Sequence, residues 1–180
     1  MPGLRLGAVL RPGGEPGAAE LVVTGERIPF DGFVTVNNRG SDFAGPWTGA
    51  VGAGTNSLTA LGERLEVLLV SAWPHREQRY GQILGSIRPG GEGLSVEGSA
   101  SYGPSEPGSV LADLDVRSEA TRLAAGLAYP LRRGRSFSLW LEAGYEWLLE
   151  RSEIAGTRLF RDRIDTAELG ARIALDDPLG

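Results

Sequence analysis

Apolar and polar residues alternate with period two along most of the chain, which is the pattern of β-strands that expose one face of each kind. The clearest segment is 136–150, where every odd position from Phe137 to Leu149 is apolar. The even positions are mostly Ser, Gly and Glu, with Trp140 and Leu148 as exceptions. A helical spacing accounts for fewer of the apolar residues, so the pattern predicts a strand.

The same alternation predicts several more strands, and two of them are less regular. The clear segments are 94–102, 121–131 and 166–176, and the weaker ones are 63–73 and 80–88. An amphipathic helix that begins at Ser57 is the alternative for 63–73. Gly62 and the β-rich residues 68–73 favour the strand instead.

Residues 30–49, with the sequence FDGFVTVNNRGSDFAGPWTG, predict a β-hairpin. A short alternating strand leads into a polar corner, and Gly-Pro-Trp opens the second strand. The motif residues of this corner are Asn38, Arg39, Gly40, Ser41 and Gly45. Asn and Gly tolerate positive φ, so the motif is predicted to turn the chain. A contact between Arg39 and a partner is the functional alternative.

From Gly32 onwards the pattern gives about eight strands in up-and-down order, joined by connections that alternate in length. The tight connections are 57–62, 89–93 and 132–135, and the longer ones are 74–79, 104–117 and 151–163. This alternation is typical of transmembrane β-barrels, whose short turns are periplasmic. The predicted strands of about nine to fifteen residues suffice for a tilted span of roughly 9–11. The predicted fold is therefore all-β, an antiparallel up-and-down segment of a transmembrane β-barrel.

Aromatic residues are predicted to lie near the strand ends, as in the two interfacial girdles of a membrane barrel. The long-loop end carries Trp47, Trp73, Tyr80, Tyr102 and Trp147, and a short turn is flanked by Tyr129 and Phe137. A soluble β-sandwich would bury its aromatic residues in the middle of its strands.

The polar face of the strands has a different meaning in each of these folds. In a membrane barrel the apolar face contacts lipid and the polar face lines a lumen. The residues predicted to face the lumen are Glu97, Arg122, Glu142, Glu146, Glu150, Glu168 and Arg172. A lumen with this charge suits the passage of hydrophilic material. In a soluble β-sandwich or a small binding barrel, the same residues would be solvated surface charges.

The first 29 residues form a separate unit in this interpretation. Strands at 4–10 and 20–24 flank a Gly/Pro-rich turn at 12–17, which predicts a compact hairpin of a preceding small domain. Pro29 interrupts strand pairing, so the two domains are predicted as 1–29 and 30–180. The N-terminus lacks the pattern of a signal peptide, and the chain is expected to be cut from a longer polypeptide.

Composition removes several functional classes. The chain has no Cys, which excludes disulfides and Cys-ligated metals. A net charge of -5 argues against nucleic acid as a partner. The glycine-rich segment 49–54 lacks the strand–loop–helix context of a nucleotide site. His75 is the single histidine, which is too few for a typical zinc site without cysteine. Asp176 and Asp177 precede a proline and are typical of a turn rather than of paired catalytic acids. No catalytic, cofactor-binding or metal-binding residue is predicted, and the protein is not expected to be an enzyme.

Several motifs resemble those of the two-partner-secretion transporters, the hemolysin secretion/activation family. Residues 10–67 resemble the junction between the second POTRA domain and the first barrel strands of that family. The matching positions are Pro16, Gly17, Leu21 and Val23 in the hairpin, Asn38, Gly40, Ser41 and Gly45 in the corner, and Leu61, Gly62 and Glu63 in the next turn. Turns at 129–131 and 177–180 are similar as well.

This resemblance implies a sixteen-stranded outer-membrane barrel of which the chain supplies about half, with a periplasmic POTRA remnant before it. It also implies a large secreted exoprotein as the partner, outer-membrane lipid around the barrel, and no cofactor. The family's inward-folded loop, plug helix and first POTRA domain have no counterpart in the sequence. An outer-membrane assembly factor of the same superfamily is the alternative, with barrel proteins as its clients.

Overall fold

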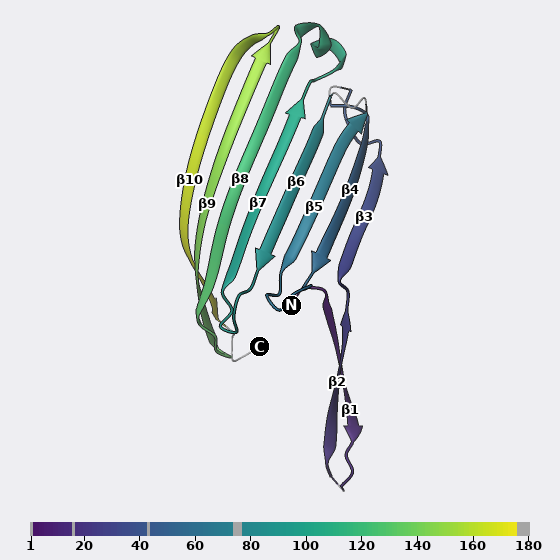
Figure 1. Ribbon diagram of the computed structural model, residues 1–180, viewed down its shortest axis with the longest axis vertical. Helices are drawn as coiled ribbons and strands as arrows, with labels where there is room; N and C mark the ends of the chain where they lie inside the picture. The colour runs from purple at the N-terminus through teal and green to yellow at the C-terminus, as the bar shows by residue number, and fades with distance from the viewer. Residues whose placement is uncertain (1, 16, 43, 74–76, 176–180) are drawn as a thin grey trace.

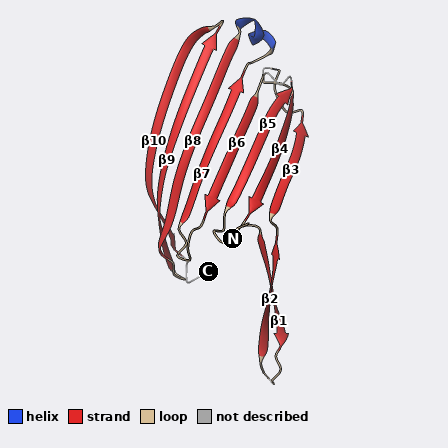
Figure 2. Cartoon of the chain, viewed as in Figure 1, coloured by secondary structure: helices blue, strands red, loops and turns tan. Residues whose placement is uncertain are grey.

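The computed structural model describes residues 2–15, 17–42, 44–73 and 77–175, and most of these are in β-strands (Figure 2). Strands β1 (Leu4–Pro12) and β2 (Ala19–Arg27) form a two-stranded antiparallel hairpin. The remaining strands form one eight-stranded sheet in the order β10-β9-β8-β7-β6-β5-β4-β3. Every pair in it is antiparallel and consecutive, so the predicted up-and-down order is confirmed.

The strands of the large sheet differ in length. They are β3 (Phe30–Asn37), β4 (Trp47–Asn56), β5 (Arg64–Trp73), β6 (Arg79–Ile87), β7 (Ser95–Ser105), β8 (Val116–Arg132), β9 (Phe137–Ile154) and β10 (Thr157–Leu175). A 3-10 helix, η1 (Ser109–Leu114), connects β7 to β8. Figure 1 shows β8, β9 and β10 reaching beyond β3, β4 and β5 at one end, while the β1–β2 hairpin projects from the other. None of the described helical segments is long and apolar enough to cross a membrane.

The large sheet is a single layer without a hydrophobic core. Among the described residues, the buried apolar side chains are Ala72, at 2% exposure, and Pro130. Side chains of directly paired residues share a face, and Val51 pairs with Val34 on one side and with Leu69 on the other. The resulting apolar face includes Val34, Val36, Val51, Leu65, Leu69, Ile83, Leu123, Leu127, Leu141, Leu169 and Ile173, all of them exposed. A soluble β-sandwich would cover such a face with a second sheet, so that alternative is wrong for the described part.

The last three strands are longer than the alternation predicted. β9 continues to Ile154 and β10 already begins at Thr157, so the predicted long loop at 151–163 is wrong. Ala155 (φ 49) and Gly156 (φ 74) instead form a two-residue turn whose positive φ values match a type I′ hairpin. The backbone of β9 and β10 stays paired in this region, although both faces of the sheet carry polar and charged side chains. The alternation of apolar and polar residues therefore ends before the strands do.

The predicted alternation of long and short connections is also wrong. β5 ends at Trp73 and β6 begins at Arg79, so this connection is no longer than the one from β4 to β5. The two ends of the sheet differ through the lengths of β8–β10 and through η1.

In the connection after β4, the Glu63 carboxylate accepts hydrogen bonds from Thr59 N (2.6 Å) and Thr59 Oγ1 (2.8 Å). Backbone hydrogen bonding at Glu63 itself and the Thr59 side chain lower the pKa of Glu63.

The β1–β2 hairpin is attached to the sheet by several hydrogen bonds near residues 2–3 and 27–29. Ile28 N donates to Gly3 O (2.7 Å), which continues the ladder of the hairpin itself. Asn56 N donates to Pro29 O (2.8 Å), which links the end of β4 to the segment between β2 and β3. Ser57 Oγ donates to Pro2 O at 2.9 Å. Pro29 lies between the end of β2 and the start of β3, where the sequence placed the boundary. The assignment of the hairpin to a POTRA domain stays a prediction.

Candidate functional site

All seven residues predicted to face a lumen lie on one face of the sheet. Ladder register places Glu97, Gly126, Gly144 and Glu168 side by side across four strands. The neighbouring rows bring in Arg122, Glu142, Glu146, Glu150 and Arg172. We call this set of seven residues, Glu97, Arg122, Glu142, Glu146, Glu150, Glu168 and Arg172, the charged face.

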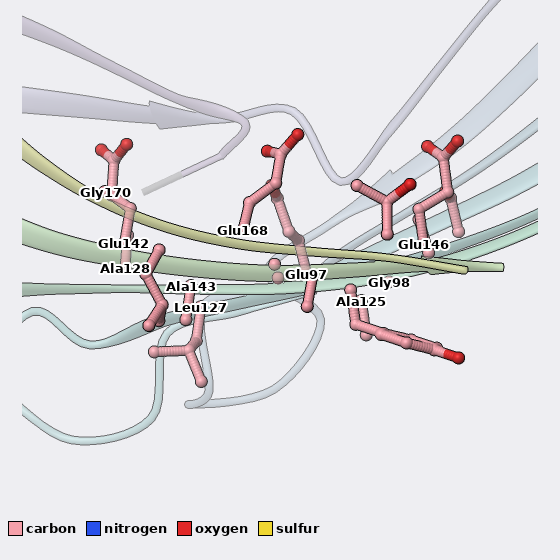
Figure 3. Close-up of a pocket in the computed structure, with 18 of the residues that line it drawn as sticks. Glu97, Gly98, Ala125, Leu127, Ala128, Glu142, Ala143, Glu146, Glu168 and Gly170 are labelled. Carbon is pink, nitrogen blue, oxygen red and sulfur yellow. The ribbon is translucent and has the colours of Figure 1, made fainter. Parts of the chain in front are cut away.

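The charged face lies on the concave side of the sheet. A hollow of about 920 Å³ is lined by Glu97, Glu142, Glu146 and Glu168, and a second of about 510 Å³ by Arg122 and Glu150. Figure 3 shows the carboxylates of Glu142, Glu146 and Glu168 pointing to the same side, away from Leu127 on the apolar face. The curvature of the sheet therefore gathers these charges around a common space.

The charged face carries a net negative charge. Arg122 Nε lies 3.4 Å from Glu146 Oε1, and Arg172 Nε lies 2.9 Å from Glu142 Oε1. Arg172 also stacks over the ring of Trp140, with 4.6 Å between Cζ and the ring centroid. Exposed ion pairs of this kind contribute little to stability. Five carboxylates and two guanidinium groups instead give the concave surface a negative field.

A further acidic residue belongs to this face and was not predicted. Asp162 lies directly opposite Glu150 on the ladder between β9 and β10. The sequence placed Asp162 in a loop, so its strand position could not be counted. Because β10 extends through this region, the negative surface continues beyond the residues that the apolar alternation indicated.

A polar cluster at the foot of β3, β4 and β5 was also missed. Asn56 is only 2% exposed; its Nδ2 donates to Asp31 Oδ2 (2.6 Å) and to Ile28 O (3.3 Å). Arg64 Nη1 donates to Asn56 Oδ1 (2.5 Å) and Asp31 Oδ2 (3.0 Å), and Arg64 Nη2 donates to Glu66 Oε2 (2.8 Å). The available sequence signal was the position of Asn56 and Arg64 on either side of the 57–63 turn. The cluster joins the start of the sheet to the hairpin that precedes it.

The corner after β3 turns the chain as predicted, but by another means. Neither Asn38 nor Gly40 has positive φ; Gly45 does, at φ 90. Gly40 is required by a close approach, since a Cβ there would lie 1.9 Å from the carbonyl oxygen of Gly45. The backbone closes with Gly40 N donating to Pro46 O (3.2 Å), and Ser41 Oγ accepts from Ala44 N (3.2 Å).

In the outer-membrane transporter that the resemblance implies, replacing Arg39 with Ala is expected to leave barrel assembly and secretion unchanged, within about 0.5 kcal/mol for stability. The reason is that Arg39 is exposed and only its backbone N–H is engaged, donating to Asn37 Oδ1 at 3.1 Å. The amount of secreted exoprotein and the amount of folded, heat-modifiable barrel are measured in the same samples. Loss of secretion with normal assembly would contradict the purely structural role of Arg39 and favour a partner contact.

The aromatic residues follow the predicted girdle only in part. Trp47 and Trp73 lie at strand ends and directly opposite each other. Tyr80 is the second residue of β6, but it pairs with Val70 on the concave side. The prediction that Tyr80 belongs to a lipid-facing girdle is therefore wrong. Trp147 lies inside β9, since that strand continues to Ile154.

The described residues contain no group of three His, Cys, Asp or Glu side chains that could hold a metal ion. His75, Asp176 and Asp177 lie outside the described residues, as does the 177–180 turn. The glycine-rich segment 49–54 forms the centre of β4.

No protein-family model and no curated protein matches the sequence. Two solved structures are similar in fold. CdiB from Escherichia coli has a TM-score of 0.75 at 16% identity, and CdiB from Acinetobacter baumannii has a TM-score of 0.63 at 14% identity. Each comparison covers 96% of this chain but only 33% and 34% of the CdiB chains, so the chain spans about a third of their length. The chain therefore has the fold of part of a CdiB-like β-barrel.

Proposed function

We propose that this chain is the barrel segment of an outer-membrane transporter that secretes a large partner exoprotein by two-partner secretion. The observation that carries the proposal is a coreless, curved sheet with one apolar face and one charged concave face, in the fold of CdiB. CdiB proteins are outer-membrane transporters of this kind. The motifs at 16–23, 38–45 and 61–63 support the same assignment.

The two faces suit a wall between lipid and a water-filled passage. Strands β3 to β7 have 8 to 11 residues, close to the roughly 9–11 that a tilted strand needs to cross the hydrocarbon region. Lipid would cover the apolar face, and the charged face would line the passage. An unfolded hydrophilic chain would make few apolar contacts with these charged residues and would therefore not be held in the passage by them.

In this proposal the β1–β2 hairpin is the periplasmic end of a POTRA domain. The exoprotein would be recognised there and would pass the barrel without covalent chemistry or a cofactor. The polar cluster around Asn56 and Arg64 supports this arrangement, because it fixes the hairpin to the first three strands of the wall.

The test first searches the neighbourhood of the gene for a large repetitive exoprotein, and then co-expresses that exoprotein with the full-length protein that contains this chain. Detergent-extracted outer membrane should contain the transporter, and the culture medium should contain the exoprotein only when the transporter is present. Recovery of the transporter in the soluble periplasm would overturn the membrane assignment. If absence of the transporter leaves the exoprotein level in the medium unchanged but reduces the amounts of other outer-membrane barrels, the assembly-factor alternative is favoured instead.

A further inference from the structure

The hairpin formed by the far ends of β9 and β10 sorts its charges between its two faces. Glu150 and Asp162 point to the concave side, as their ladder positions require. Arg151, Arg161 and Arg163 occupy the alternate positions and point outward, together with Arg158 beyond the bulge at Leu159. We call these four residues, Arg151, Arg158, Arg161 and Arg163, the arginine ladder. The arginine ladder lies on the same side of the sheet as the apolar face and begins beyond the last row of apolar residues.

Two of these arginines are placed where like charges repel. Arg151 and Arg161 lie directly opposite each other on adjacent strands, and both are exposed. Like charges in that position destabilise a sheet unless something neutralises them. Glu119 lies directly opposite Arg151 on β8, and Glu153 lies directly opposite Arg158. Among the described residues, however, no ion pair joins Arg151, Arg158 or Arg161 to a carboxylate. Arg163 pairs with Asp165 at 2.8 Å.

The arginine ladder begins where the apolar face ends. Trp147 lies opposite Asp165, and Leu149 lies opposite Arg163 one row further out. Arg151 and Arg161 form the next row. In a membrane barrel, Trp and Tyr mark the headgroup level, and charges just beyond it face the headgroups themselves. This is the end of the sheet opposite the β1–β2 hairpin (Figure 1). With that hairpin in the periplasm, as proposed above, the headgroups are those of the outer leaflet.

We propose that the arginine ladder binds the phosphate groups of the phosphorylated glucosamine lipid of the outer leaflet. The inference rests on the proposed outer-membrane function. Guanidinium groups bind phosphate oxygens through two parallel hydrogen bonds, and one phosphate between Arg151 and Arg161 would remove their repulsion. The exoprotein is a poorer candidate for this surface, because the ladder faces away from the concave side through which cargo would pass.

The experiment measures lipid bound to the purified full-length protein, reconstituted with lipid A or with enzymatically dephosphorylated lipid A. Wild-type protein should retain lipid A and release the dephosphorylated form. Each arginine near an anionic surface contributes about a fivefold gain in affinity, so R151Q/R161Q should bind lipid A at least about tenfold more weakly. R151K/R161K keeps the charge but loses the paired hydrogen bonds, so its affinity should lie between those of the wild type and R151Q/R161Q.

The matched control is R133Q/R135Q, which removes the same charge from exposed positions at the opposite end of the sheet and should bind lipid A like the wild type. Equal binding of both lipids by the wild-type protein would overturn the inference even if R151Q/R161Q fails to assemble. Equal lipid A binding by wild type and R151Q/R161Q would overturn it as well. Failure of the proposed function is separate: the wild-type protein would then be missing from the outer membrane or would not secrete.

Discussion

In the proposed outer-membrane barrel, replacing Leu69 with Arg is expected to lower stability by about 2–4 kcal/mol, the cost of a charge on the lipid face near the bilayer midplane. Leu69 lies in the middle of β5, points to the apolar face and is 53% exposed in the bare sheet. In the full-length protein, the variant should yield much less heat-modifiable barrel in the outer membrane. Urea unfolding of refolded protein in lipid vesicles gives the free energy directly.

Leu68→Arg is the matched control, because the same substitution one residue earlier points to the concave side. Leu68 lies opposite Gln82 and Gly52 on the neighbouring strands. We expect the Leu68→Arg variant to assemble at close to the wild-type level, since its guanidinium group would meet water in the passage. If Leu68→Arg were the more damaging substitution, the assignment of the two faces would be inverted. Equal, small effects of both would contradict the membrane setting.

Replacing Asn56 with Ala is expected to reduce the free energy of unfolding by about 1–3 kcal/mol, because it leaves buried hydrogen-bonding groups without partners. The variant removes an acceptor from Arg64 and a donor from Asp31 and Ile28 O. The hairpin should also become looser, and limited proteolysis between residues 27 and 30 should therefore be faster. Urea unfolding in vesicles and a proteolysis time course measure the two effects.

Asn38→Ala serves as its control, since Asn38 is exposed and makes no side-chain hydrogen bond within the part of the chain that the structure describes. Its stability should stay within about 0.5 kcal/mol of the wild type. Equal stability of Asn56→Ala and wild type would show that water replaces the amide and that the polar cluster does not hold the hairpin.

Alternation predicted the architecture because one-sided exposure is what a single-layer sheet imposes on its sequence. Segments such as 94–102 and 121–131 became β7 and β8, and the seven charged residues fell on one face. The strand ends of β9 and β10 could not be predicted in this way. Where both faces carry polar and charged side chains, as around Arg151 and Arg161, backbone pairing persists without any apolar signal.

The polar cluster escaped prediction for a different reason. Asp31, Asn56 and Arg64 are separated along the chain and meet only because β3, β4 and β5 are in one register. Each residue alone matches an ordinary strand-end polar position. The corner shows the same limit, since Gly40 is needed for a backbone contact with Gly45 that only the folded loop creates.

The missing core has a consequence for when this protein can fold. Because Ala72 and Pro130 are the only buried apolar side chains in the described part, water cannot drive the collapse of this sheet as it does for a globular domain. In the proposed outer-membrane setting, the free energy that a soluble protein gains by burying its interior is gained only when acyl chains cover Leu69, Leu127 and their neighbours. Folding and insertion would then be one event, and the chain would have to stay unfolded until it reaches the membrane.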